Sequence, residues 1–84
     1  MNQELPKLPP KASKAFKVFV GRANKGLLHQ LDWERFYRFV SVCHATRVTL
    51  SEDDVYRLLR SEGFSQAKYI SSIFYHLNNF ARMR

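Results

Sequence analysis

The side chains whose chemistry most clearly suggests a function in this sequence are its lysines and arginines. The 84-residue chain has 14 Lys and Arg against 7 Asp and Glu, a formal net charge of +7. The excess is uneven, because six basic residues up to His29 face only Glu4, and no acid follows Glu62. Such a chain attracts polyanions, and phosphate backbones are the most abundant of these. The charge therefore indicates nucleic-acid binding.

Two helices expected in the second half of the chain could read DNA. The first ends near Gly63 and the second begins after Ser65, which leaves a tight turn of three or four residues containing glycine. A turn of this kind joins the helices of a helix-turn-helix, whose second helix enters the major groove N-terminus first. Its leading side chains would include Gln66 and Lys68, which suit the edges of adenine and guanine.

This region partly resembles the helix-turn-helix motif of DNA-binding proteins, over about 20 residues. Leu59, Gly63 and Tyr69 stand at the small-residue, glycine and aliphatic positions of the motif. Leu59 is larger than the alanine preferred at the small-residue position, and the aliphatic Ile70 lies one residue after the aliphatic position of the motif. An ordinary antiparallel helix hairpin within a bundle explains the same pattern. Both interpretations stay open from the sequence.

The favoured hypothesis is a small, non-enzymatic protein that binds nucleic acid, with double-stranded DNA favoured over RNA. Lysines and arginines would neutralise phosphates, while the residues that follow Gly63 would approach bases. The candidate nucleic-acid-binding residues are Lys14, Lys17, Arg22, Lys25, Arg57, Arg60, Ser65, Gln66, Lys68 and Tyr69.

The alternative hypothesis is an adaptor or inhibitor that binds a partner protein or forms a homodimer. Phe39 and Val42 broaden the apolar face of their helix beyond what one neighbour needs, and Tyr56 and Tyr75 fall outside the main apolar stripes. Exposed apolar side chains that cluster on one surface mark protein interfaces. These four residues are the candidate partner-binding residues.

Catalytic, metal-binding and membrane functions find little support in the sequence. His29, His44 and His76 are widely separated, and Cys43 has no second cysteine beside it. We therefore expect no catalytic site, no metal and no cofactor. No apolar stretch is long enough to span a bilayer, although the first expected helix, basic on one side, could also lie on anionic lipid. One cysteine and no secretory signal predict a cytoplasmic protein.

The apolar spacing predicts an all-α fold, a small bundle of three to four helices. Apolar residues recur every three or four positions over 11–23, 33–44 and 66–81, and a shorter helix is expected between Ser51 and Gly63. All three prolines fall within 1–10, which predicts a flexible arm ahead of one helical domain over 11–84. The last two helices form the unit that resembles a helix-turn-helix.

Local signals predict where several of these helices begin and end. Ser51 stands three residues before Asp54, the spacing of a capping box, and Asp32 and Ser65 are expected to cap the following helices. Gly26 and Gly63 are expected to end the preceding helices in the left-handed conformation, with Phe64 touching Leu59.

Overall fold

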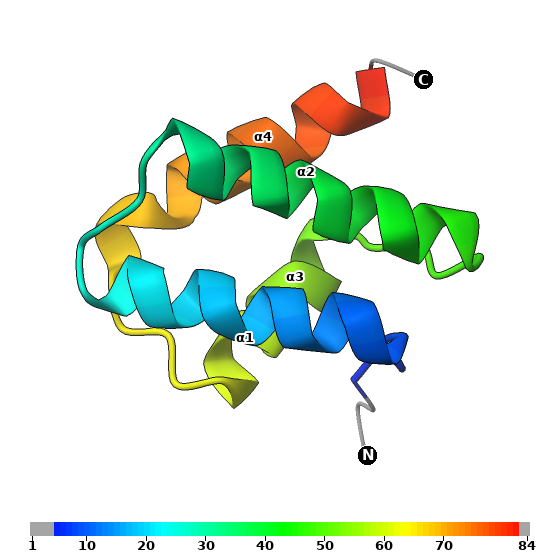
Figure 1. The fold of residues 1–84 in the computed structure, drawn as a ribbon, viewed down its shortest axis with the longest axis horizontal. Helices are drawn as coiled ribbons and strands as arrows, with labels where there is room; N and C mark the ends of the chain where they lie inside the picture. Colours follow the sequence, from blue (N-terminus) through cyan, green and yellow to red (C-terminus); the bar gives the residue numbers. More distant parts are fainter. Residues whose placement is uncertain (1–4, 83–84) are drawn as a thin grey trace.

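Residues 5–82, the part of the chain that the computed structural model describes, contain four α-helices and one short 3₁₀-helix (Figure 1). Their bounds are α1 Pro10–Asn24, α2 Gln30–Ala45, α3 Glu52–Ser61, η1 Ala67–Tyr69 and α4 Ile70–Arg82. No strand occurs within this range, so the expected all-α fold is confirmed. Residues 1–4 of the expected arm lie outside the described residues, and Leu8 packs against the core.

Aromatic packing holds α1 and α2 side by side and antiparallel (Figure 1). The rings of Phe16 and Phe39 lie 4.9 Å apart, and those of Phe19 and Phe36 lie 5.1 Å apart. Aromatic pairs at such distances contribute about 0.5–1.5 kcal/mol each beyond the area that they bury. Val55 and Leu59 from α3 and Ile73 from α4 complete the same core.

The expectation that Phe39 lies on an exposed partner-binding surface is wrong. Its side chain is only 2% exposed, because it packs against Phe16 from α1 and Phe36 from its own helix. Val42 is half-buried and packs on the edge of the same core. The broad apolar face of α2 is therefore used within the fold, since several elements cover it.

Three helices end in a Schellman motif, in which the residue after the C-cap adopts a left-handed backbone. Gly26 and Gly63 fill this position after α1 and α3, as the sequence predicts, and Arg47 fills it after α2 with a φ of 65°. The diagnostic amide-to-carbonyl bonds run from Leu27 to Arg22, from Val48 to Cys43 and from Phe64 to Leu59, at 3.0, 2.8 and 3.0 Å.

Two helices begin at residues other than those expected. α2 begins at Gln30, so Asp32 lies in its first turn and is not the N-cap. α4 begins at Ile70, because the amide of Tyr69 bonds to the carbonyl of Gln66 in a 3₁₀ turn. The whole of 62–69 therefore separates α3 from α4, a longer connection than the three- or four-residue turn expected.

We predict that replacing Arg47 with glycine stabilises the fold. A left-handed backbone costs a non-glycine residue about 1–2 kcal/mol, and the larger unfolded-state entropy of glycine offsets part of the gain. The free energy of unfolding should rise by about 1 kcal/mol in urea titrations followed by circular dichroism. Gly63→Ala, the matched reverse change at the end of α3, should lower it by a similar amount. Equal stability of the Arg47→Gly variant and the wild type would contradict the prediction.

Candidate nucleic-acid interface

The exposed side of α1 carries a row of lysines. Lys14, Lys17, Gly21 and Lys25 follow one another at spacings of three and four residues, which places them on one face of the helix. All four are exposed, and no atom lies within 4 Å of where a Cβ of Gly21 would be. We refer to Lys14, Lys17 and Lys25, with Gly21 between them, as the lysine stripe. Lys11, which was not among the expected nucleic-acid-binding residues, is also exposed, one turn before Lys14.

The lysine stripe lies in a part of the chain without negative charge. Residues 5–31 contain no Asp or Glu, and the first acid after them, Asp32, is buried. Among the described residues, none of the stripe lysines takes part in an ion pair. Their ammonium groups therefore project into solvent with no internal counter-charge to reduce their attraction for an anion.

Arg22, expected to bind phosphate, is engaged inside the protein. Its Nε donates to Oδ1 of Asp32 at 2.5 Å, and its Nη2 donates to the carbonyl of Leu27 at 3.1 Å. Asp32 also accepts from the backbone amide of His29 at 3.0 Å, and Arg35 lies 4.0 Å from its carboxylate. Burial acts to raise the pKa of Asp32, but these hydrogen bonds and positive charges outweigh it and lower that pKa. Arg22 therefore fixes the α1–α2 connection and is only partly available to a ligand.

Arg57, another expected phosphate ligand, is also engaged. Its Nη2 lies 2.6 Å from Oδ1 of Asp54, and its Nε is buried without a hydrogen-bond partner within the described chain. Asp54 in turn accepts from the amide of Ser51 at 3.1 Å, while Ser51 caps α3 as the sequence predicts. The charge of Arg57 is therefore largely neutralised locally.

Ser65 and Gln66, expected to read bases, are tied to the end of α1 by Asn24. The Asn24 Oδ1 accepts from the amide and the hydroxyl of Ser65 at 2.9 and 3.2 Å, and its Nδ2 donates to the Gly63 carbonyl at 3.1 Å. The Gln66 side chain donates to the Asn24 carbonyl at 3.1 Å. Ser65 therefore does not cap α4. The Ser65 hydroxyl and the Gln66 side-chain amide are already hydrogen-bonded to Asn24. No local sequence signal reveals Asn24, because its partners are some 40 residues away.

The remaining candidates keep exposed charges beside aromatic rings. Arg60 is exposed, and its guanidinium carbon lies 5.8 Å from the ring centre of Tyr56. Lys68 is exposed on η1, with its Nζ 5.4 Å from the ring centre of Tyr69. Tyr69, also among the expected nucleic-acid-binding residues, is half-buried against the core.

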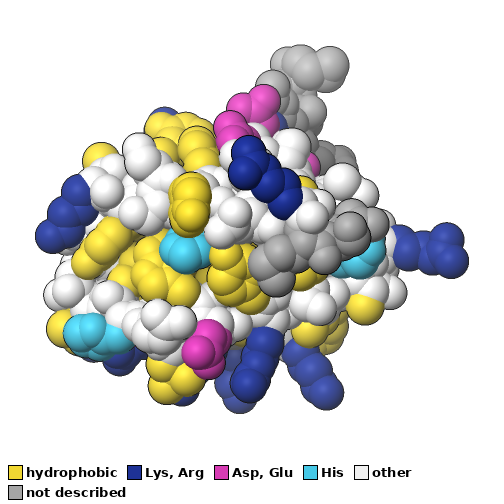
Figure 2. Space-filling model, turned by 90° about the horizontal axis from the view of Figure 1, so that it is seen from above, with side chains coloured by type: hydrophobic (Ala, Val, Ile, Leu, Met, Phe, Trp, Pro, Cys, Tyr) yellow, Lys and Arg dark blue, Asp and Glu magenta, His cyan; other side chains and the backbone are white. Residues whose placement is uncertain are grey.

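A second distinctive surface lies between α2 and α4. Figure 2 shows hydrophobic side chains around a histidine in the middle of this face, with basic side chains mostly at its edge. Trp33 stacks on His76 at 4.2 Å, Tyr37 Oη lies 2.9 Å from His76 Nδ1, and Tyr75 is 62% exposed. We call these four residues the aromatic patch. Burial lowers the pKa of His76, which keeps the patch uncharged at neutral pH.

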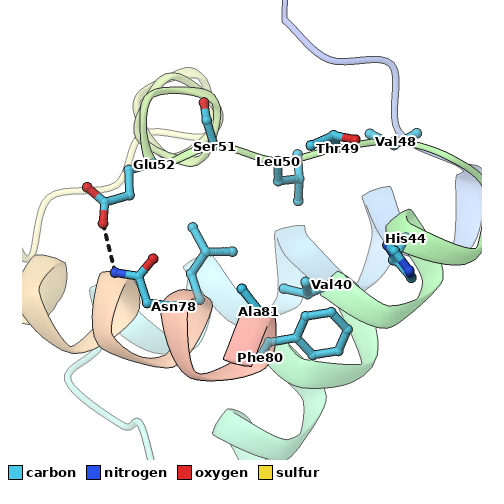
Figure 3. A pocket seen from close by; sticks show the side chains of 11 residues that line it. Val40, His44, Val48, Thr49, Leu50, Ser51, Glu52, Asn78, Phe80 and Ala81 are labelled. Atoms are coloured by element: carbon cyan, nitrogen blue, oxygen red, sulfur yellow. Dashed lines mark hydrogen bonds between the residues drawn. The ribbon is translucent and has the colours of Figure 1, made fainter. Parts of the chain in front are cut away.

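A cleft of about 380 Å³ opens between α2, the 48–52 segment and α4 (Figure 3). Glu52 at one end accepts from Nδ2 of Asn78 at 2.9 Å, while His44 lies at the other end. Ser51 Oγ is occupied by the capping bond to Asp54. The polar groups of the cleft therefore do not converge on a shared point, as an acid–base or nucleophilic site would require. Burial also raises the pKa of the Cys43 thiol to about 11, so it is not a thiolate at neutral pH.

Within residues 5–82, no three His, Cys, Asp or Glu side chains cluster as metal ligands would, and no helix has the length and apolarity to cross a membrane. No protein-family model matches this chain, and none of the curated proteins or solved structures compared with it matches either. The functional assignment therefore rests on the chain's own side chains and their geometry.

We predict that Asp32→Asn lowers the free energy of unfolding at pH 7 by about 1–2 kcal/mol, because it removes the charge that Arg22 and the His29 amide bind. The folded-state pKa of Asp32 is below the value of 3.8 for a free side chain, so this stabilisation is present above that value and is lost as pH falls further. Urea titrations at a series of pH values should show the gap between wild type and variant narrowing as the pH falls below 3.8 and the folded-state carboxylate becomes protonated. A gap that does not change with pH would show that the charge is not its source.

Proposed function

We propose that this chain is a non-enzymatic nucleic-acid-binding protein that contacts the phosphate backbone through the lysine stripe, with duplex DNA favoured over RNA. The observation that carries the proposal is the exposed face of α1, where lysines lie in an acid-free part of the chain and form no internal ion pairs. Phosphate contacts of this kind supply most of the affinity of non-specific DNA binding.

The spacing of the lysine stripe suits an extended polyanion. At a rise of about 1.5 Å per residue, Lys14 and Lys25 lie roughly 16 Å apart along α1, while duplex DNA carries about one charge per 1.7 Å of its axis. Several phosphates therefore fall within reach of the stripe. B-form DNA is favoured over RNA because its wide major groove admits a helix, whereas the major groove of A-form RNA is deep and narrow.

The proposed binding is largely independent of sequence. The polar groups suited to base edges, those of Ser65 and Gln66, are hydrogen-bonded to Asn24, and the exposed stripe consists of lysines that act as point charges. Contacts to phosphate position a protein on DNA but carry no direct sequence information. We therefore expect similar affinities for unrelated duplexes of equal length.

We predict that Lys14→Ala combined with Lys17→Ala weakens duplex binding and reduces its salt dependence. Each phosphate contact contributes about 0.9 to the slope of log K against log salt, so losing two should reduce the slope by about 1.8. Fluorescence anisotropy with labelled duplex at about 50 and about 200 mM salt measures both quantities. The matched control is Arg38→Ala with Arg82→Ala, which removes the same charge from exposed positions on α2 and α4.

The control double variant should keep the wild-type slope. Equal losses in the two double variants would show diffuse attraction to net charge and no interface on α1. A wild-type protein that binds no duplex at about 50 mM salt would remove the nucleic-acid function altogether.

The aromatic patch supports a second candidate, binding to an apolar protein surface. Tyr75 and Tyr56 are exposed as the sequence-based alternative expected, but Trp33 and His76 take the place of the buried Phe39. Tyrosine and tryptophan are enriched at protein interfaces, where a large ring area is buried at low cost in conformational entropy. The first protein to test is a second copy of this chain.

We predict that the patch mediates self-association, which sedimentation velocity over a range of protein concentrations would detect. Tyr75→Glu should shift the protein toward monomer, because burying the introduced carboxylate in an apolar interface is costly. Tyr56→Glu, an equal change at the exposed tyrosine on α3, is the matched control and should leave the association unchanged. A wild-type protein that is monomeric at every concentration would rule out self-association.

A further inference from the structure

A shallow groove of about 340 Å³ lies between α3 and the segment that leads into α4. Its volume is at the small end of the ~300–1,000 Å³ range of small-molecule sites. The apolar side chains of Phe64 and Ile70 line it and also pack on the core, so these walls are fixed. The other lining residues are Tyr56, Arg60, Ser65 and Ala67.

An arginine and an aromatic ring lie together in this groove. Tyr56 is 42% exposed, and Arg60, one helical turn later on α3, places its guanidinium 5.8 Å from the ring centre. Arg57 next to them is neutralised by Asp54, but Arg60 forms no ion pair within the described residues. The groove therefore offers a flat aromatic surface together with an uncompensated positive charge.

One end of the groove lies near the C-terminal end of the lysine stripe. Asn24, next to Lys25, bonds to the carbonyl of Gly63 and to the amide of Ser65, and Ser65 lines the groove. The C-terminal end of the stripe therefore adjoins the groove. A phosphate backbone that followed α1 toward Lys25 would therefore come close to the groove at Ser65.

We propose that this groove holds the base of one unpaired nucleotide in a DNA whose backbone lies along the lysine stripe. This inference rests on the proposed function and narrows its substrate to DNA that exposes an unpaired base, such as a duplex with a single-stranded end. The base stacks on Tyr56 and the guanidinium plane of Arg60, between the apolar walls. Stacking of this kind tolerates any base, because every base has a π face.

The test uses three labelled DNAs that share one duplex. The first is blunt, the second carries a short single-stranded overhang, and the third carries the same overhang with abasic sites and equal phosphate number. Wild type should bind the second more tightly than the third by about five- to 150-fold, the range for one stacked base. Tyr56→Ala should abolish this difference, while Tyr56→Phe, which keeps the ring, should retain it.

Leu31→Ala, a truncation of an exposed apolar side chain on α2 outside both proposed surfaces, is the matched control and should keep the wild-type difference. The blunt duplex reports the lysine stripe alone, so all variants should bind it like wild type, which also shows that they fold. Equal binding of the base-bearing and abasic overhangs by wild type would overturn the groove proposal and leave the backbone function intact. A difference that survives in Tyr56→Ala would also overturn it, and no binding to any of the three DNAs would overturn both.

Discussion

The bonds that converge on Asp32 fix the arrangement on which the rest of the structure depends. Asp32 is 2% exposed, and its carboxylate accepts from Arg22 near the end of α1 and from the His29 amide just before α2. A buried carboxylate is tolerated only when it is paired and hydrogen-bonded. The α1–α2 connection is therefore held in the one geometry that satisfies it, and the antiparallel pair of helices follows. The phenylalanine rings then interlock, which leaves the lysines of α1 outside.

Asn24 has the corresponding role for the second half of the chain. Its side chain joins α1 to the Gly63 carbonyl and the Ser65 amide, while Gln66 bonds to its carbonyl. These bonds hold the segment before η1 against the helix end and delay the start of α4. The residues that could have read bases from an exposed helix start are used to position one element on another. The stripe lysines and Arg60 form no ion pair within the described residues, and the proposed binding surfaces depend on them.

The parts of this fold that could be predicted from the sequence depend on residues close together in the chain. The capping bonds between Ser51 and Asp54 and the left-handed Gly63 with its Leu59–Phe64 bond are local, and the structure confirms them. The lysine row on α1 was also predictable, because it requires only helical spacing and the absence of acids. The contacts of Arg22, Phe39 and Gln66 could not be predicted, because each is decided by a partner on another element that helical periodicity does not identify.

The arrangement of helices also gives the molecule two distinct sides. In the view of Figure 1, α1 and α4 lie on opposite sides of α2; the lysine stripe belongs to α1, whereas the aromatic patch belongs to α2 and α4. If α1 bound a polyanion as proposed, the aromatic patch with Trp33 and Tyr75 would stay accessible to other molecules. Anchoring many copies on one strand raises their local concentration, so even a weak affinity between exposed rings becomes effective. If both proposed contacts form, the molecule would connect two partners, with the lysine stripe binding the polyanion and the aromatic patch binding a neighbouring copy.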